Sequence, residues 1–246
     1  MKATLYAVPA SHPSACVEAA LVLKGIPYRR VDRVTLLHKL PQRIRFGRPT
    51  VPGLVIDGER LAGSREILKR LDELVQEPAL YPGEGASARE IEEAERWGDE
   101  VLQPAARRLT YASLRRRTGA LRSYFEGARL ILPTSLLMIS RGPSILVGAR
   151  FNGATDENVR RDLSELPGWL DHIDDLIGAG VLGGPEPNAA DLQVGSSLRL
   201  LLTLGDVLPL LEARPAASLA RRHFAEFPGE VPAGALPREW LPEVDR

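Results

Sequence analysis

The sequence of 246 residues contains a single cysteine, Cys16, and this scarcity narrows the kinds of protein that it can encode. One cysteine excludes an intrachain disulfide and a metal site built from several thiolates. It is also typical of a protein that works in a reducing compartment, so we expect a cytoplasmic protein. Aromatic residues are scarce too, at 5% of the chain, but hydrophobic residues reach 44%, which is enough to fill one large core or two smaller ones.

The sequence also lacks an excess of one charge and a long apolar run. Its 32 basic and 32 acidic side chains cancel, so no overall field attracts nucleic acid or an anionic membrane. The stretch that comes nearest to a membrane span, residues 130–139, is much shorter than the roughly 20 residues that a membrane-spanning helix needs. We therefore predict no nucleic-acid partner and no membrane span.

The first 76 residues alternate between strand and helix patterns. Residues 3–8 form a short apolar run that stops at Pro9, which is typical of a buried central strand. Pro13 then stands where a helix begins, and Lys24 and Gly25 indicate its end. Residues 29–34 have a second strand pattern, and the basic residues 35–48 are predicted to be irregular.

A hairpin and a helix follow in the same half of the chain. Residues 50–58 form a strand pattern that ends in an Asp-Gly turn, and residues 59–62 return as its partner. Ser64 is the expected N-cap of the next helix, because apolar residues recur behind it at helical spacing up to Leu74.

Residues 77–86, which are rich in proline and glycine, are the predicted linker, and the remaining residues, 87–246, are predicted to be all-helical. From Phe227 onward, prolines and scattered apolar residues predict an extended tail on the surface. The helical patterns begin near residue 87, with a kink at Pro104, and continue over residues 117–140, 155–178, 188–204 and 208–225.

Three motifs of the first 76 residues resemble the glutathione S-transferase superfamily. They are the strand-turn-helix Leu5-Tyr6-x4-Ser11-His12-Pro13-Ser14, the run His38-Lys39-Leu40-Pro41 ahead of Arg48-Pro49-Thr50-Val51-Pro52, and the helix start Gly63-Ser64-Arg65-Glu66-Ile67. Asn188-Ala189-Ala190-Asp191 is similar to the family's capping box on a buried helix. The resemblance implies a thioredoxin-like α/β domain over residues 1–76 followed by an all-helical bundle domain.

The resemblance also implies two candidate catalytic residues. Such proteins bind the tripeptide thiol glutathione and favour its thiolate, which is the nucleophile. Ser11 would donate a hydrogen bond to that sulfur from the start of a helix, although Ser11 or Ser14 could instead only cap the helix. His12 could act as a base or orient a substrate, or else lie in an exposed turn. Cys16, inside the helix, is expected to be a small buried hydrophobe.

Further positions are implied to hold the thiol peptide. Val51-Pro52 would be a cis peptide that turns the Val51 backbone toward the cysteinyl part, and Ser64 would bind the γ-glutamyl carboxylate or act as a plain N-cap. Gly63 stands where the family has an acidic residue, which removes a contact to the ligand's ammonium. The binding candidates are Ser14, His38, Lys39, Arg48, Val51, Pro52, Gly63 and Ser64, with His38, Lys39 and Arg48 assigned to the glycyl carboxylate or to solvated loop positions.

The leading hypothesis is an enzyme that uses glutathione as co-substrate and promotes thiolate attack on a small electrophile. The alternative is a low-activity binding protein for an apolar ligand or a different low-molecular-weight thiol, and a third reading is an interaction module. Helices near residues 97–111 and 115–124 should wall the electrophile pocket. Their arginines, at 107, 108 and 115–117, indicate an anionic co-substrate or only a charged surface. The resemblance implies a homodimer in which residues 64–74 face the partner's helices near residues 90–109.

Overall fold

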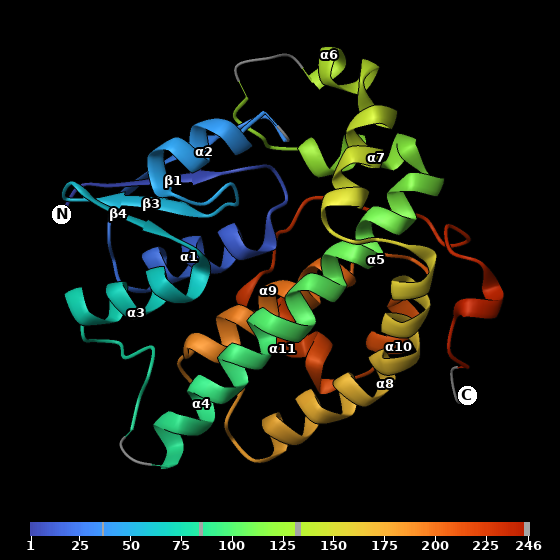
Figure 1. Ribbon diagram of the computed structural model, residues 1–246. Coiled ribbons are helices and arrows are strands. Elements are labelled where there is room, and N and C mark those ends of the chain that lie inside the picture. The colour runs from blue at the N-terminus through green and yellow to red at the C-terminus, as the bar shows by residue number, and fades with distance from the viewer. Residues whose placement is uncertain (36, 84–85, 131–133, 244–246) are drawn as a thin grey trace.

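The structure is a computed structural model that describes residues 1–35, 37–83, 86–130 and 134–243. Figure 1 shows a small unit of strands and helices at the N-terminal end, coloured blue to cyan, packed beside a larger group of helices. The predicted fold class is confirmed, because a four-stranded mixed sheet with its helices precedes a helical region. Within the described ranges, no helix combines the length and apolarity needed to span a bilayer.

The sheet has the strand order β2-β1-β3-β4, so β1 is internal as its apolar sequence predicts. The strands are β1 (Ala3–Ala7), β2 (Tyr28–Asp32), β3 (Gly53–Ile56) and β4 (Glu59–Ala62). β1 runs parallel to β2 and antiparallel to β3. The predicted Asp-Gly turn joins β3 to β4, and Asp57 and Gly58 both have positive φ angles, of 46° and 92°.

Three helices belong to this first domain. They are α1 (His12–Leu23), α2 (Lys39–Phe46) and α3 (Ser64–Leu74). α1 begins with Ser11 as its N-cap and ends before Gly25, close to the predicted bounds. Because α1 packs against α3 on one side and against a helix of the second domain on the other, its start lies at the junction of the two domains.

The irregular segment predicted over residues 35–48 is wrong in part, because α2 occupies residues 39–46. Pro41 argues against a helix, but it is the third helical residue, where no intrahelical N–H bond is lost. The apolar pattern is also misleading, since Leu40 and Ile44 are exposed while Gln42 is buried. Residue 36 lies outside the described residues.

The predicted N-cap of α3 is displaced by one residue. Gly63 holds the N-cap position with φ 96°, and Ser64 is the first helical residue. The Gly63 N–H donates to the Pro52 carbonyl at 3.1 Å, which ties the start of α3 to the turn before β3. A positive φ at this point favours glycine and moves the N-cap away from the serine.

The second domain contains most of the helices. Its elements are α4 (Ala86–Trp97), a π-helical turn (Gly98–Leu102), α5 (Gln103–Arg116), a 3₁₀ helix (Thr118–Phe125), α6 (Thr134–Ile139), α7 (Arg141–Phe151), α8 (Asp156–Gly178), α9 (Ala189–Leu201), α10 (Leu208–Leu211), α11 (Pro215–His223) and a 3₁₀ turn (Arg238–Trp240). The π-helical turn lies directly before Pro104, where the sequence predicts a kink.

The single helix predicted over residues 117–140 is wrong. A 3₁₀ helix ends at Phe125, and Gly127, with φ 71°, turns the chain before α6 begins. Residues 131–133 lie outside the described residues, as do residues 84–85 of the predicted linker, so the division at residues 77–86 stays a prediction. α7 has no counterpart in the sequence patterns.

α9 is the central helix of the second domain. It packs against α1, α4, α5 and α11, and of its thirteen residues only Arg199 is not fully buried. The predicted capping box at its start is confirmed. The Asp191 N–H donates to the Asn188 side chain at 3.0 Å, and the Asp191 carboxylate accepts from the Asn188 N–H at 3.0 Å and from the Gly183 N–H at 2.7 Å.

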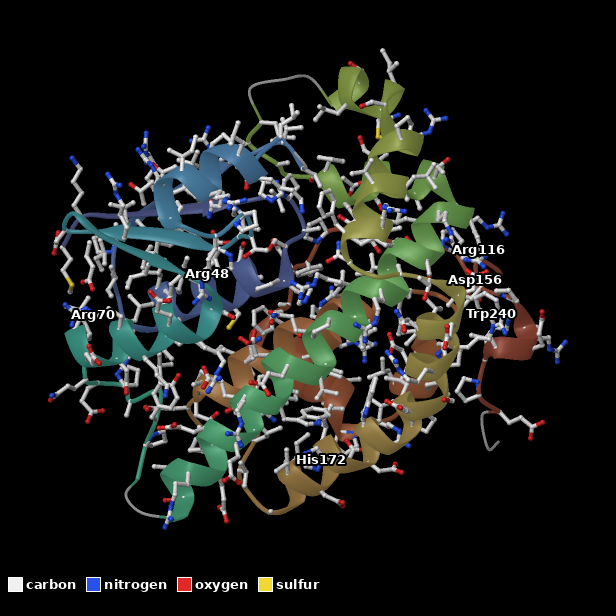
Figure 2. All side chains as sticks on the ribbon, in the orientation of Figure 1. Arg48, Arg70, Arg116, Asp156, His172 and Trp240 are labelled. Atoms are coloured by element: carbon white, nitrogen blue, oxygen red, sulfur yellow. The ribbon has the colours of Figure 1, made fainter. Side chains whose placement is uncertain are left out.

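The tail that begins at Phe227 lacks an α-helix in its described part, but it does more than lie on the surface. Val231 pairs with Leu204 in an isolated bridge and is buried. Near the tail's end, the Trp240 ring lies 4.8 Å from the guanidinium carbons of both Arg116 and Arg160. Figure 2 shows Trp240 next to Arg116 and Asp156, which are themselves paired. The tail is therefore part of the folded second domain, apart from residues 244–246, which are not described.

Candidate active site

A cavity of about 210 Å³ lies between the two domains. The first domain contributes the loop after β1, the start of α1, the start of α2 and residues 49–51. The second domain contributes one face of α5, the 3₁₀ helix after it, and α7. Both predicted wall segments of the electrophile pocket supply lining residues, among them Tyr111 and Tyr124, whereas Trp97 stacks edge-on against His172 instead.

Ser11 lines this cavity and also caps α1. Its Oγ accepts hydrogen bonds from the Ser14 backbone N–H at 3.3 Å and from the Ser14 hydroxyl at 2.8 Å. A serine hydroxyl has two acceptor lone pairs and one donor proton, so both lone pairs are used and the proton stays available. Capping the helix and donating to a ligand are therefore compatible at Ser11, without rotation of the hydroxyl.

Ser14 has a different place from Ser11. It is fully buried, it does not line the cavity, and its hydroxyl donates to Ser11. It holds Ser11 in position but does not face a ligand.

His12 is buried with 2% of its surface exposed, which rules out the exposed turn. It lines the cavity, and no hydrogen-bond partner of its Nε2 atom is found in the part of the chain that is described. Burial and the nearby charge of Arg107 lower the pKa of His12 well below its ordinary value, although the Gln103 backbone acts in the opposite direction. The imidazole is therefore neutral at pH 7.

This lowered pKa predicts how stability changes with pH. Below about pH 6.5 the unfolded chain protonates His12 while the folded chain does not, so the free energy of unfolding falls as the pH is lowered. Between pH 7.5 and pH 5.5, we expect the temperature of thermal unfolding to fall more for the wild type than for His12→Gln. His38 and His223, whose pKa values burial also lowers, remain in both proteins. Parallel losses would contradict the assignment.

The Val51-Pro52 peptide bond is cis, as predicted, and Val51 lines the cavity together with Ser11. Ser64 is not among the residues that line it, and its side chain is buried with 3% exposed. Gly63 lies beside Ser64, and a side chain at Gly63 would approach the Arg48 guanidinium at 3.3 Å. The start of α3 therefore lies next to the cavity's edge and not in its wall.

The three candidates for a glycyl carboxylate are divided between two places. His38 and Lys39 line the cavity, and burial lowers the pKa of both side chains. The Lys39 Nζ lies 3.5 Å from the centre of the Phe151 ring, which brings α2 and α7 together at one side of the cavity. Arg48 is 62% exposed and pairs with Glu66 at 3.8 Å, and Figure 2 shows it beside the start of α3.

Cys16 is not a candidate nucleophile. It is fully buried, and its thiol contacts the Gln193 Oε1 at 3.6 Å. Burial, with smaller contributions from Glu95 and Asp99, raises the pKa of Cys16 well above its ordinary value. This placement agrees with its interpretation as a small buried hydrophobe.

A second, larger hollow of about 900 Å³ borders the other side of Ser11. Three of its charged residues are paired, with Arg30 bound by Glu18 and by Asp32. The Asp32 carboxylate also accepts from the Arg129 N–H at 3.0 Å. We place the candidate active site in the smaller cavity, because that cavity brings Ser11 together with His12 and Val51.

Comparison with known proteins agrees with this geometry. The sequence model of the family "Glutathione S-transferase, N-terminal domain" matches residues 5–79. Among proteins with curated descriptions, no sequence matches the chain.

Solved structures extend the likeness to the whole chain. A glutathione S-transferase from Rhodospirillum rubrum F11 has a TM-score of 0.60 and 20% identity, covering 97% of each chain. One from Sinorhizobium meliloti 1021 has a TM-score of 0.61 and 19% identity, covering 97% of this chain and 96% of that one. A glutathione transferase from Populus trichocarpa has a TM-score of 0.62 and 16% identity, covering 89% and 92%.

Residues 5–79 are therefore similar in sequence to the N-terminal domain of glutathione S-transferases, and the solved structures show that the chain as a whole has the fold of these proteins.

Proposed function

We propose that this protein is a cytoplasmic glutathione S-transferase-like enzyme that binds glutathione in the cavity and promotes attack of its thiolate on a small electrophile. The observation that carries the proposal is the environment of Ser11. Its hydroxyl accepts two hydrogen bonds from Ser14 at the start of α1, which leaves its proton to donate toward the cavity. A donor aimed at the sulfur favours the thiolate, and the positive end of the α1 dipole adds to the effect.

The remaining parts of the thiol peptide are assigned to the edges of the cavity. The Val51 backbone, beside Ser11, would pair with the cysteinyl part. Lys39 would hold the glycyl carboxylate at one side of the cavity. The first amides of α3, with Ser64, would hold the γ-glutamyl carboxylate where it extends past the cavity's edge. His38 and Arg48 stay secondary candidates, and Pro52 and Gly63 act through the backbone turn that they form.

One observation favours the alternative, a binding protein for an apolar ligand or a different small thiol. Gly63 has a φ of 96°, which an acidic residue would adopt only with strain. The contact to the ligand's ammonium that the family's acidic residue provides is therefore missing for a backbone reason. A thiol without a γ-glutamyl group would lose nothing at this position.

Retention of the full chain on immobilised glutathione, followed by a conjugation assay with 1-chloro-2,4-dinitrobenzene, separates these functions. Retention with conjugation supports the transferase, and retention without conjugation supports the binding protein. Failure to be retained, together with activity toward another low-molecular-weight thiol such as cysteine, would replace glutathione as the ligand. If no thiol tested binds or reacts, the proposed function is refuted, and the interaction module remains as the class of protein.

We also propose a homodimer formed through α3 and the region of α4 and α5, residues 90–109. Some exposed charges of this face pair within the chain, with Lys69 bound to Glu92 at 3.2 Å and Arg70 to Glu59 at 2.9 Å, and the apolar Leu74 at the end of α3 is exposed. Light scattering should give twice the chain mass of 26.9 kDa at low salt. A chain that stays monomeric at all concentrations tested would refute this proposal.

A further inference from the structure

The charged side chains of the cavity have one sign. Lys39 and Arg107 line it, and no described residue of its lining is an aspartate or a glutamate. Most other lining residues are apolar or aromatic, including Leu114, Ile145 and Phe151. A site with this composition suits a molecule that is apolar over most of its surface and carries a negative charge.

Arg107 lacks the partner that its neighbours in α5 have. Arg108 binds Asp162 through two bonds, of 2.5 and 2.9 Å, and Arg115 and Arg116 both bind Asp156. In the described parts of the chain, no hydrogen bond or ion pair reaches the Arg107 guanidinium. Of the five arginines of the predicted basic wall, three form ion pairs away from the cavity, and Arg117 donates to the Gly234 carbonyl at 3.2 Å. Only Arg107 lines the cavity.

The environment of Arg107 raises the free energy of the folded chain when this guanidinium has no partner. Burial lowers the pKa of Arg107, and the charge of Arg108 acts in the same direction. Asp99 opposes the shift, but it lies beyond ion-pair distance and accepts instead from the Gln103 side chain at 2.7 Å. A partly buried cation without a close counter-ion is destabilising, and an anionic ligand would reduce that cost.

Tyr111 supplies a second donor at the same place. It follows Arg107 by one helical turn, so both side chains lie on one face of α5, and it also lines the cavity. Burial raises the pKa of Tyr111, so the phenol keeps its proton, and its hydroxyl has no hydrogen-bond partner among the described residues. A side chain at Gly148 would collide with the Tyr111 ring, so α7 packs closely against this ring and fixes it.

We propose that Arg107 and Tyr111 form a binding site for the carboxylate of an apolar carboxylic acid. The acid's apolar part packs on Leu114, Ile145 and Phe151, and its single charge matches the single guanidinium. This carboxylate site would also identify the second substrate of the proposed function as an apolar carboxylic acid. Only that identification rests on the proposed function, because binding of the acid alone does not require a thiol. His12 lies beside the site as a neutral group and adds no charge to it.

Calorimetry on the full chain with 4-phenylbutyrate and its neutral amide tests this site without any thiol. We expect the wild type to bind the acid at least about tenfold more tightly than the amide, because a hydrogen bond to a charged group exceeds a neutral one. Arg107→Met should lose roughly 10-fold to 100-fold in affinity for the acid and almost nothing for the amide. Arg96→Met, which removes the same charge from an exposed position of α4, should bind both as the wild type does. Tyr111→Phe should lose a few-fold for the acid only.

Two results would overturn the proposal. The first is equal affinity of the wild type for the acid and the amide, a comparison that needs no variant and holds even if Arg107→Met fails to fold. The second is equal affinity of Arg107→Met and Arg96→Met for the acid, which would move the anion site to Lys39 or elsewhere. None of these binding measurements contains a thiol. The carboxylate site can therefore be confirmed even if the conjugation assay fails, and it can be refuted even if that assay succeeds.

Discussion

Ser11→Ala is expected to lower the turnover of thiol conjugation by roughly 10-fold to 100-fold at neutral pH, with binding of the thiol peptide nearly unchanged. The Ser11 proton is the donor left free at the start of α1, and a hydrogen bond to a charged group is worth about 1.5 to 3 kcal/mol. The peptide's carboxylates and backbone are held elsewhere. Stopped-flow or steady-state kinetics with direct measurement of thiol-peptide affinity would check both halves of this expectation.

The pH profile separates this role from a structural one. As the pH rises toward the pKa of the free thiol, the thiol ionises without help, so the rate of Ser11→Ala should climb toward that of the wild type. Ser14→Ala is the matched control, because it removes a bond to Ser11 but leaves the Ser11 proton in place, and it should lose much less. If Ser11→Ala kept full activity while His12→Ala abolished it, the imidazole would be the group that acts on the sulfur.

Asp191→Ala should lower the free energy of unfolding by about 2 to 6 kcal/mol. The Asp191 carboxylate is fully buried and accepts from the Gly183 and Asn188 N–H groups, and each buried N–H left without a partner costs about 1 to 3 kcal/mol. For a chain of this size, thermal unfolding should shift down by roughly 5 to 20 °C. Calorimetry or circular dichroism during heating measures the shift.

Two controls show whether burial causes the effect. Asp191→Asn keeps an acceptor oxygen, so it should lower the free energy of unfolding by less than Asp191→Ala does. Asp206→Ala removes the acceptor of three backbone N–H groups, those of Gly234, Ala235 and Leu236, at a more exposed place. Asp206 is half-buried, so water can replace part of the lost bonds, and the free energy of unfolding should fall by less than for Asp191→Ala. Equal losses for Asp191→Ala and Asp206→Ala would mean that the capping box is not what makes Asp191 important.

The parts of the fold that sequence predicts are those fixed by local chemistry. Pro9 ends β1, the Asp57-Gly58 pair forms the hairpin turn, and Asn188 with Asp191 forms the capping box, because each depends on residues a few positions apart. α2 fails this test. Its apolar Leu40 and Ile44 face outward, and a periodicity that does not mark the buried face gives no local signal.

The site is less predictable because its properties come from distant residues. His12 looks like an exposed turn residue until α5, some ninety positions later, covers it with Gln103 and Arg107. The difference between Arg107 and Arg108 is equally hidden, since it depends on Asp162 of α8 lying beside only one of them. Sequence spacing places both arginines on α5, but it does not show which of them lacks an acidic partner within the chain and can bind an anionic ligand.

The burial of α9 has a consequence for how the molecule folds. The apolar cluster under the sheet includes Ala189, Leu192 and Phe224 of the helical half, packed with Cys16 and Val17 of α1. The face of α1 opposite α3 would be open to water in residues 1–76 alone. We therefore expect the two halves to unfold together as one cooperative unit, with α9 as the element that they share.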